Sequence, residues 1–442
     1  MLLRLIMNHF LSFDEPTQFD MFPNLKRTSL ASHIYEKNGL KLLKISAIYG
    51  PNAAGKSNVI KALQFLKKFA VNIDFLNNND IEPYIFCLKK EKNPSLNLTL
   101  EFSTDDDSFF VYDVEISDNY VINEKLYESF PLENKFDVIY SRKGSDVKGV
   151  NDKYAELLKN ILRKNKKTSL LALNSEVPIL EDKRVNKVTS FFRKKLKIID
   201  INTRIPDVIE LVRKNEDLLV FTKKIFGFLG LGIDDLQIKD ENFDQWIKNH
   251  NELAKKLPAL ESEKQGISLF ENERQLLSIK IENGIQKVYK FIFDQIGKNG
   301  YKGQLGAEAQ SNGTIRLLTL VPALYGALKR NETVVIDEIN HCLHPTLVAG
   351  FVRYFVDNNS SAGQLIFTTH DINLLDDRTP NESDDNSTVD RLLRSDEVWF
   401  VDKVDGCSTL YSHNNFKEHN TISMLRGYLE GRYGAIRYWG NK

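Results

Sequence analysis

The segment IYGPNAAGKSN at Ile48–Asn58 contains the phosphate-loop pattern GxxxxGK[ST], which runs from Gly50 to Ser57. The loop follows a largely apolar run, Leu42–Tyr49, that predicts a strand. It precedes Lys56–Phe69, whose apolar residues have helical spacing. A strand, a glycine-containing loop and a helix in this order are the context that the motif requires. The segment therefore predicts an α/β core that binds a nucleotide.

The residue types in the loop suit the binding of phosphate groups. Gly50 and Gly55 let the backbone turn so that its N–H groups face the phosphates, and the helix N-terminus adds partial positive charge. Lys56 is expected to reach the β- and γ-phosphates, and the hydroxyl group of Ser57 is expected to ligate Mg²⁺. The expected nucleotide-binding residues of the loop are Gly50, Pro51, Asn52, Ala53, Ala54, Gly55, Lys56, Ser57 and Asn58.

Two adjacent carboxylates follow a second apolar strand, in the segment TVVIDE at Thr333–Glu338. Asp337 is expected to hold the metal ion, through a water molecule, and so to complete the metal site with Ser57. Glu338 is expected to orient and polarise the attacking water molecule. An acid directly after the metal-binding aspartate favours hydrolysis over transfer to a second substrate. The predicted ligands are therefore a nucleoside triphosphate and Mg²⁺.

Two further segments suit contacts to phosphate. Ser311 and Gly313 open an apolar helix, which makes an anion site, although Ser-x-Gly is also a common helix cap. His370 follows the predicted strand Gln364–Thr369 at its C-terminal end, where an imidazole can reach a γ-phosphate. The segment HCLHP reads as a turn at a dimer interface, with a metal site as the alternative. That metal site would consist of His341, Cys342 and His344.

The composition narrows the class of protein. The chain has 442 residues, 42% of them hydrophobic and 27% charged, with no net charge, which is ordinary for a folded soluble protein of two or three domains. No run of about 18 apolar residues is present, so no membrane span and no membrane partner are expected. The three cysteines have no metal-binding spacing and favour a reducing, cytoplasmic location. They are Cys87, Cys342 and Cys407.

Three parts of the chain differ in pattern. Residues 1–145 hold the phosphate loop, residues 146–270 are predicted to form a helical insertion, and residues 271–442 hold the other motifs. The pair Asn283-Gly284 lies between two alternating runs and suits a type I′ hairpin. Three β-rich runs in the first part predict an antiparallel meander: Ser95–Phe102, Phe109–Ile116 and Tyr120–Tyr127.

The zero net charge hides a separation of charge along the chain. The run Lys153–Lys197 has 13 Lys and Arg residues against 4 Asp and Glu, whereas Asp371–Glu397 has 9 acidic residues against 3 Arg. The basic run is either a set of solvated helix faces or a surface for nucleic acid or an acidic partner. Few aromatic residues lie within it beyond Phe191 and Phe192, so the run does not support base stacking.

The segments IYGPNAAGKSN, QSNGTIRLL, VVIDEINHCLHP and QLIFTTHDINLLD occur in this order, with a long insertion after the first. Together they resemble the SMC/ABC-head ATPases. Within these they resemble the compact bacterial phage-defence group that is RloA/AriA-like and related to the overcoming-lysogenization-defect ATPases. The closing segment GYLEGRYGAIRYW at residues 427–439 looks like the ending of the RloA/AriA type. The resemblance implies an α/β fold: an ABC/SMC-type P-loop ATPase head with an antiparallel β-subdomain and a helical insertion.

The resemblance also implies a homodimer, or a ring of dimers, with two ATP molecules at the interface. Ser311 and Gly313 would contact the γ-phosphate of ATP held by the other subunit, and Glu338 and His370 would be catalytic. The signature Ser311-Asn312-Gly313 departs from the usual Ser-Gly-Gly of the family.

In the family such an ATPase is a sensor and scaffold that controls a toxic nuclease and responds to a phage-derived trigger. The acidic residues Asp384, Asp385 and Asp390 lie in a predicted loop and not at strand ends, so a Toprim-like nuclease is expected as a separate chain. The alternative is a DNA-clamping ATPase of repair or recombination, which would bind nucleic acid directly. A transporter motor is disfavoured, because no coupling glutamine is apparent.

Overall fold

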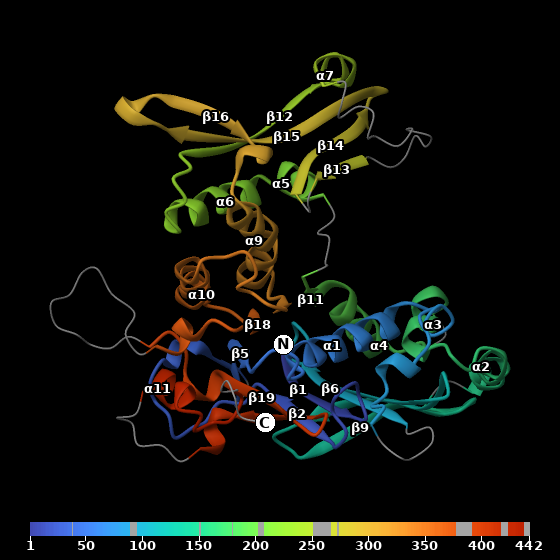
Figure 1. Cartoon of the computed structure of the whole chain (residues 1–442). Helices are drawn as coiled ribbons and strands as arrows, with labels where there is room; N and C mark the ends of the chain where they lie inside the picture. Colours follow the sequence, from blue (N-terminus) through green and yellow to red (C-terminus); the bar gives the residue numbers. More distant parts are fainter. Residues whose placement is uncertain are drawn as a thin grey trace. The chain divides into compact units, whose positions relative to one another are not determined.

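The computed structural model describes ten segments of the chain, and Figure 1 shows their helices and strands. The segments are 1–37, 39–88, 95–149, 152–178, 180–201, 207–250, 267–271, 274–376, 391–416 and 423–436. The predicted acidic loop with Asp384, Asp385 and Asp390 lies outside these residues, as does the end of the segment 427–439. No helix within the described segments is long and apolar enough to cross a membrane.

The chain divides into two compact units, each built from segments that are distant in the sequence. The first unit contains Met1–Ile201, Gly326–Ile339 and Phe355–Lys442, and the second contains Asn202–Tyr325 and Asn340–Tyr354. The predicted insertion at residues 146–270 is thus shared between the two units. The division into 1–145, 146–270 and 271–442 stays a prediction.

A six-stranded, mainly parallel sheet forms the centre of the first unit. Its order is β11-β17-β18-β5-β19-β20, in which only β20 runs antiparallel to its neighbour. Every residue of β5, β17 and β18 is buried, as is usual for parallel strands. The carboxyl ends of these three strands therefore meet at one edge of the sheet. The bounds are β11 (Leu196–Ile199), β17 (Thr333–Ile336), β18 (Gln364–Thr368), β5 (Ile45–Tyr49), β19 (Val398–Val404) and β20 (Cys407–Ser412).

A seven-stranded antiparallel sheet is the second layer of the same unit. Its order is β10-β9-β8-β7-β6-β1-β2, and the predicted meander is confirmed as β6, β7 and β8. Buried and half-exposed residues alternate along β7, since one face packs on the core. The bounds are β1 (Leu2–Asn8), β2 (Thr17–Asp20), β6 (Leu96–Ser103), β7 (Phe109–Ser117), β8 (Tyr120–Phe130), β9 (Lys135–Lys143) and β10 (Asp146–Lys148).

The single strand predicted at Leu42–Tyr49 is wrong, because the chain forms two strands there. The first, β4 (Leu40–Leu43), pairs with β3 (Ile34–Lys37), and the second is β5. Lys44 separates them: its buried Nζ donates to the carbonyl oxygens of Ser32 (2.9 Å) and Asn359 (2.8 Å). A buried lysine must form hydrogen bonds through its ammonium group, and Lys44 does so at the point where the chain passes from pairing with β3 to pairing within the parallel sheet.

Helix α1 (Lys56–Val71) confirms the helical spacing that follows the phosphate loop. Its apolar residues share one hydrophobic core with residues of both sheets, such as Val335 of β17 and Leu100 of β6. The other described α-helices that lie wholly in this unit are α2 (Asp152–Lys164), α3 (Leu170–Glu176), α4 (Lys183–Ser190) and α11 (Met424–Leu429).

The second unit contains a five-stranded antiparallel sheet. Strands β14 and β15 meet at Asn283 and Gly284, with φ angles of 51° and 78°, so the predicted hairpin is confirmed. The bounds are β12 (Asp235–Asn242), β13 (Ile267–Glu271), β14 (Arg274–Glu282), β15 (Ile285–Ile296), β16 (Lys302–Gly306), α5 (Val208–Arg213), α6 (Glu216–Phe228) and α7 (Phe243–Asn249).

The helical insertion expected at residues 146–270 contains strands at four places. The first is β10, which pairs with β9 in the seven-stranded sheet. Strand β11 extends the parallel sheet of the first unit by pairing with β17, and β12 and β13 belong to the sheet of the second unit. These short segments form strands because they pair with strands that are distant in the sequence, and the local spacing of apolar residues does not reveal such pairing. Two further helices, α9 (Asn312–Arg330) and α10 (Pro345–Asn358), have residues in both units.

Candidate nucleotide-binding site

The loop between β5 and α1 has a backbone that favours glycine. The φ angles are 154° at Gly50, 63° at Ala53 and 116° at Gly55. A Cβ atom at Gly50 would collide with the carbonyl oxygen of Val401, and one at Gly55 would lie 2.5 Å from the hydroxyl oxygen of Ser408. Gly55 is also the N-cap residue of α1 and provides no side-chain cap, so the helix start offers N–H groups to an anion. The loop has the features that phosphate binding requires.

Lys56 is buried against its own loop. Its Nζ donates to the carbonyl oxygens of Gly50 (3.0 Å) and Pro51 (3.3 Å). It lies 3.0 Å from Nε2 of His370 and 3.8 Å from Oε1 of Glu338. Burial lowers the pKa of Lys56, and the two carboxylates that follow β17 oppose this shift. The ammonium group therefore lies beside the phosphate loop. There it can replace its hydrogen bonds to carbonyl oxygens with hydrogen bonds to phosphate oxygens.

Thr368, the last residue of β18, forms hydrogen bonds with both predicted acidic residues. Its hydroxyl group donates to Oδ1 of Asp337 (2.5 Å) and accepts the backbone N–H of Glu338 (2.7 Å). Glu338 has a φ of 52°, a left-handed conformation that costs on the order of 1–3 kcal/mol and occurs often at functional sites. The Nε2 atom of His370 lies 3.0 Å from Oε1 of Glu338. Thr368 thus positions the backbone of Glu338, and His370 positions its carboxylate.

The structure brings four predicted residues together: Lys56, Asp337, Glu338 and His370. They follow β5, β17 and β18 at the same edge of the parallel sheet, which is where ligands bind in open α/β sheets. Thr368 is the residue that the motifs did not reveal. The sequence offers only a threonine at the end of a strand, which is common in strands.

The donor groups suit Mg²⁺. Asp337 is 7% exposed and Ser57 is half-buried in the first turn of α1, next to Lys56. A hydroxyl group and one carboxylate are hard oxygen donors, and Mg²⁺ bound with substrate phosphates normally uses one or two carboxylates and keeps several water molecules. The residues present therefore fit the ion that the motif implies.

The alternative metal site in HCLHP is not formed. The Sγ atom of Cys342 lies 3.9 Å from Nδ1 of His341, and Nδ1 of His344 lies 2.8 Å from the hydroxyl oxygen of Thr346. Across the described residues, no group of three or more His, Cys, Asp or Glu side chains could hold a metal ion.

Ser311 and Gly313 lie in the second unit, so they are not among the residues that the first unit gathers around Lys56. The Oγ atom of Ser311 accepts the backbone N–H of Thr314 (3.0 Å) and so caps the start of α9. A Cβ atom at Gly313 would lie 3.2 Å from the carbonyl oxygen of Cys342. Ser311 is exposed at this helix start. The expected anion site is therefore a capped, accessible helix N-terminus.

The C-terminal aromatic residues pack against the strand that leads into the phosphate loop. The rings of Tyr428 and Tyr433 stack on Phe400 at centroid distances of 5.6 and 5.2 Å, and Tyr428 contacts Tyr49 at 6.1 Å. The hydroxyl group of Tyr49 donates to the carbonyl oxygen of Asp371 (3.1 Å). This bond ties the residue before Gly50 to the residue after His370, a link that sequence motifs could not show.

Comparison with known proteins identifies the class. Residues 45–376 match the family described as "AAA domain, putative AbiEii toxin, Type IV TA system", and because this is most of the chain, the protein belongs to that family. The class is therefore that of the AAA-type ATPases. With the parallel sheet, the phosphate loop and the antiparallel sheet described above, the predicted α/β P-loop ATPase head is confirmed. No curated protein matches the chain.

Solved SMC heads are similar to the chain at low identity. The SMC head domain from Thermotoga maritima is 14% identical, with 93% of this chain and 98% of that chain covered and a TM-score of 0.41. An SMC head bound to the C-winged helix domain of ScpA is also 14% identical, with coverages of 93% and 97% and a TM-score of 0.45. A third head, derived from Pyrococcus furiosus, is 12% identical, with coverages of 98% and 98% and a TM-score of 0.41.

Proposed function

We propose that this protein hydrolyses ATP, closes as a dimer around two ATP molecules, and in this way controls a separate nuclease of an anti-phage defence system. The observation that supports hydrolysis most is the meeting of three side chains at the phosphate loop. The ammonium group of Lys56, the carboxylate of Glu338 and the imidazole of His370 lie within 3.0 to 3.8 Å of one another. A cation, a carboxylate that can orient water and an imidazole that can stabilise developing negative charge suit the attack of water on a phosphate.

In this proposal the loop residues Gly50–Asn58 hold the phosphates with their backbone N–H groups. Lys56 moves its Nζ from the carbonyl oxygens of Gly50 and Pro51 to phosphate oxygens. Ser57 and Asp337 would hold Mg²⁺, which when bound neutralises negative charge on the phosphates. The bond from Thr368 keeps Asp337 in one orientation.

Glu338 is the group that orients the attacking water molecule and accepts its proton. Its fixed backbone and its contact with His370 place one carboxylate oxygen beside Lys56. His370 contacts the γ-phosphate and stabilises the negative charge that develops there. Glu338 and His370 are already in position before the substrate binds, so their side chains need to move little during the reaction.

The dimer is proposed from the signature. Ser311 and Gly313 would contact the γ-phosphate bound by the other subunit, and the exposed, capped start of α9 suits an anion. ATP then favours the closed dimer and hydrolysis loosens it, so a partner that prefers one state is held or released. Rings of dimers are compatible with the same contact.

The defence role is supported by the family and by the resemblance of the motifs. The family description names a toxin of a type IV toxin–antitoxin system. From the resemblance of the motifs, a separate Toprim-like nuclease is the proposed effector, and a phage-derived molecule is the proposed trigger. The cysteines Cys87, Cys342 and Cys407 are all free, which suits the cytoplasm.

The experiment that tests this function is a pull-down of tagged Glu338→Gln protein from its native host with ATP present. Bound proteins are identified by mass spectrometry, and bound nucleic acid is extracted and measured. We expect a stoichiometric nuclease chain with little DNA. The Lys56→Ala protein, which should not bind ATP, is the matched control and should lose the nuclease.

The second candidate is a DNA-clamping ATPase, and the basic run Lys153–Lys197 favours it. Abundant DNA without a protein partner in the same pull-down would support this candidate and exclude control of a nuclease. Several lysines of the run are already paired with carboxylates, which weakens a continuous DNA-binding stripe. Lys187 pairs with Asp106, and Lys195 pairs with Asp105.

A further inference from the structure

In the described part of the basic run, some cations pair with carboxylates and others do not. Lys159, Arg184, Lys187 and Lys195 all contact carboxylates. Several unpaired cations gather at the end of α2 and in the loop after it, where Arg163 adds to the effect of Lys159 in lowering the pKa of Asp146, without a direct contact. Among the residues that the structure describes, no ion pair forms with any of four cations there, which are Arg163, Lys164, Lys166 and Lys167. Three of the four are exposed and Lys167 is half-buried, so their charges face solvent.

An aromatic ring lies beside these cations. Tyr120, the first residue of β8, is 44% exposed, and Nζ of Lys166 lies 5.6 Å from the centre of its ring. The backbone N–H of Val121 donates to the carbonyl oxygen of Lys166 (3.1 Å), so the start of β8 and the loop are joined. Tyr120 lies outside the run Lys153–Lys197, so the ring is an aromatic side chain that the composition of the run does not include.

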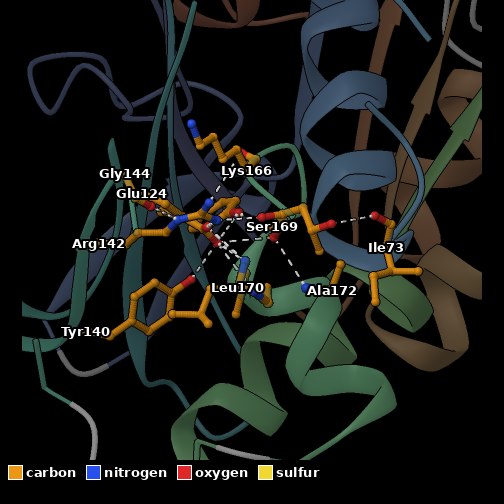
Figure 2. Close-up of polar contacts among 12 residues, drawn as sticks. Ile73, Glu124, Tyr140, Arg142, Gly144, Lys166, Ser169, Leu170 and Ala172 are labelled. Atoms are coloured by element: carbon orange, nitrogen blue, oxygen red, sulfur yellow. Dashed lines mark hydrogen bonds and ion pairs between the residues drawn. The ribbon is translucent and has the colours of Figure 1, made fainter. Parts of the chain in front are cut away.

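A buried ion pair fixes the loop from beneath (Figure 2). The side chains of Arg142 and Glu124 are 0% exposed, with Nη1 and Oε2 3.3 Å apart. Arg142 donates to the carbonyl oxygens of Lys166 (3.3 Å) and Thr168 (2.5 Å), and Glu124 accepts the backbone N–H of Leu170 (2.8 Å). Burying such a pair costs desolvation and adds little to stability, so its main result is a defined backbone for the loop.

We propose that Tyr120 and the four cations form a binding site for single-stranded nucleic acid, which we name the Tyr120 basic surface. It comprises Tyr120, Arg163, Lys164, Lys166 and Lys167. The cations would bind successive phosphates, and the exposed ring would stack on an unpaired base. Because the loop is already fixed, little conformational entropy is lost on binding.

An acidic protein and a nucleic-acid duplex would each contact only some of these groups. An acidic protein would pair with the cations but would gain little from the ring. A duplex offers phosphates but no unstacked base. Two carboxylates also lie near the start of β8: Asp118 is in the turn before Tyr120, and Asp80 accepts a hydrogen bond from Asn119 (3.0 Å). The surface includes none of the residues of the phosphate loop, and the proposal goes beyond the control of a nuclease.

The test is fluorescence anisotropy of a labelled oligothymidylate, and of the matching oligouridylate, with the full-length protein at several salt concentrations. We expect binding that weakens with salt, with a slope of log K against log salt of about −0.7 for each phosphate bound. Lys166→Gln with Lys167→Gln should lower the slope by about 1.4 and weaken binding. Tyr120→Ala should lower affinity about tenfold, because stacking is lost, whereas Tyr120→Phe should bind like the wild type.

Lys187→Gln is the matched control, since it removes one positive charge from the same basic run but from a paired lysine. It should bind like the wild type. The proposal is wrong if the wild type binds neither oligonucleotide at low salt, or if Tyr120→Ala binds like the wild type. It is also wrong if poly-glutamate binds as tightly as oligothymidylate, which would indicate an acidic protein partner. ATP hydrolysis should be unchanged in these variants, so failure here is distinct from failure of the ATPase proposal.

Discussion

The hydroxyl group of Thr368 donates a 2.5 Å hydrogen bond to Oδ1 of Asp337. The two residues lie at the ends of neighbouring parallel strands, and both are buried. The same hydroxyl accepts the N–H of Glu338, so one side chain from β18 positions the carboxylate proposed for the metal and the carboxylate proposed for the water molecule. A positioning role of this kind predicts a loss of turnover that exceeds the loss of nucleotide affinity.

We expect Thr368→Val to lower kcat for ATP at least about tenfold, because a misoriented general base usually costs this much or more. The free energy of unfolding should fall by about 1–3 kcal/mol, since a buried carboxylate loses its partner. Thr368→Ser keeps the hydroxyl group and is the control. Steady-state kinetics and ATP titration check both values. Normal turnover in the valine variant would exclude the positioning role.

Glu338→Gln should bind ATP but hydrolyse it at least about a hundredfold more slowly, because the amide cannot accept a proton from water. The trapped ATP should hold the dimer closed, which size-exclusion chromatography with light scattering measures. His370→Ala should lower turnover with a smaller effect on ATP affinity. If Glu338→Gln hydrolyses ATP at the normal rate, the general base lies elsewhere.

A site shared between two subunits predicts complementation. Gly313→Glu places a negative charge where the γ-phosphate of the other subunit is proposed, and Lys56→Ala removes the phosphate-loop cation. Each variant alone should be inactive. A one-to-one mixture should recover about a quarter of the wild-type rate, since half of the dimers are mixed and each mixed dimer has one intact site. A mixture that stays inactive, with both variants folded by circular dichroism, would count against the shared site.

Lys67 makes stability depend on pH. Burial lowers its pKa to about 8, and its Nζ donates to the carbonyl oxygen of Leu196 (2.6 Å). Between about pH 8 and the ordinary lysine pKa of 10.5, the unfolded chain binds more protons at this residue than the folded chain does. The free energy of unfolding should therefore rise with pH across this window, relative to Lys67→Met. Urea titrations at a series of pH values measure the difference, and parallel curves for the two proteins would contradict the prediction.

The buried pair of Arg142 and Glu124 predicts that loss of a buried cation lowers the free energy of unfolding more than loss of a partly exposed one. Arg142→Met should lower the free energy of unfolding by about 3–5 kcal/mol, because it leaves the carboxylate of Glu124 buried without its cation. Arg184→Met should cost less than about 1 kcal/mol, although Arg184 contacts three carboxylates, because these groups are only partly buried and water screens their charges. Thermal or chemical denaturation compares the two variants. Equal losses would show that the buried pair is no more important than a surface one.

Local patterns predicted the elements whose residues interact with near neighbours in the chain. The phosphate loop and α1, the meander of β6 to β8 and the hairpin at Asn283 follow from periodicity and turn residues. The motif positions Lys56 and Glu338 also meet in space as expected. These features depend on short-range chemistry that a sequence displays directly.

Contacts between distant segments could not be predicted in this way. Thr368 next to Asp337, and Tyr49 next to Asp371, depend on which strands become neighbours. Strand β11 has only four residues and is recognised by its pairing with β17. The aromatic ring beside Lys166 comes from β8, so the composition of the basic run does not include it.

The strand that leads into the phosphate loop has neighbours that are synthesised much later. Residues of β5 pair with Leu365–Thr368 on one side and with Val398–Phe400 on the other. During translation β5 therefore leaves the ribosome long before either neighbour, as a mostly apolar strand with two open edges. Open apolar edges invite wrong pairing, so the nascent chain should depend on chaperones until its last third has been made. A fragment that ends before Leu365 should be insoluble when expressed alone, whatever motifs it contains.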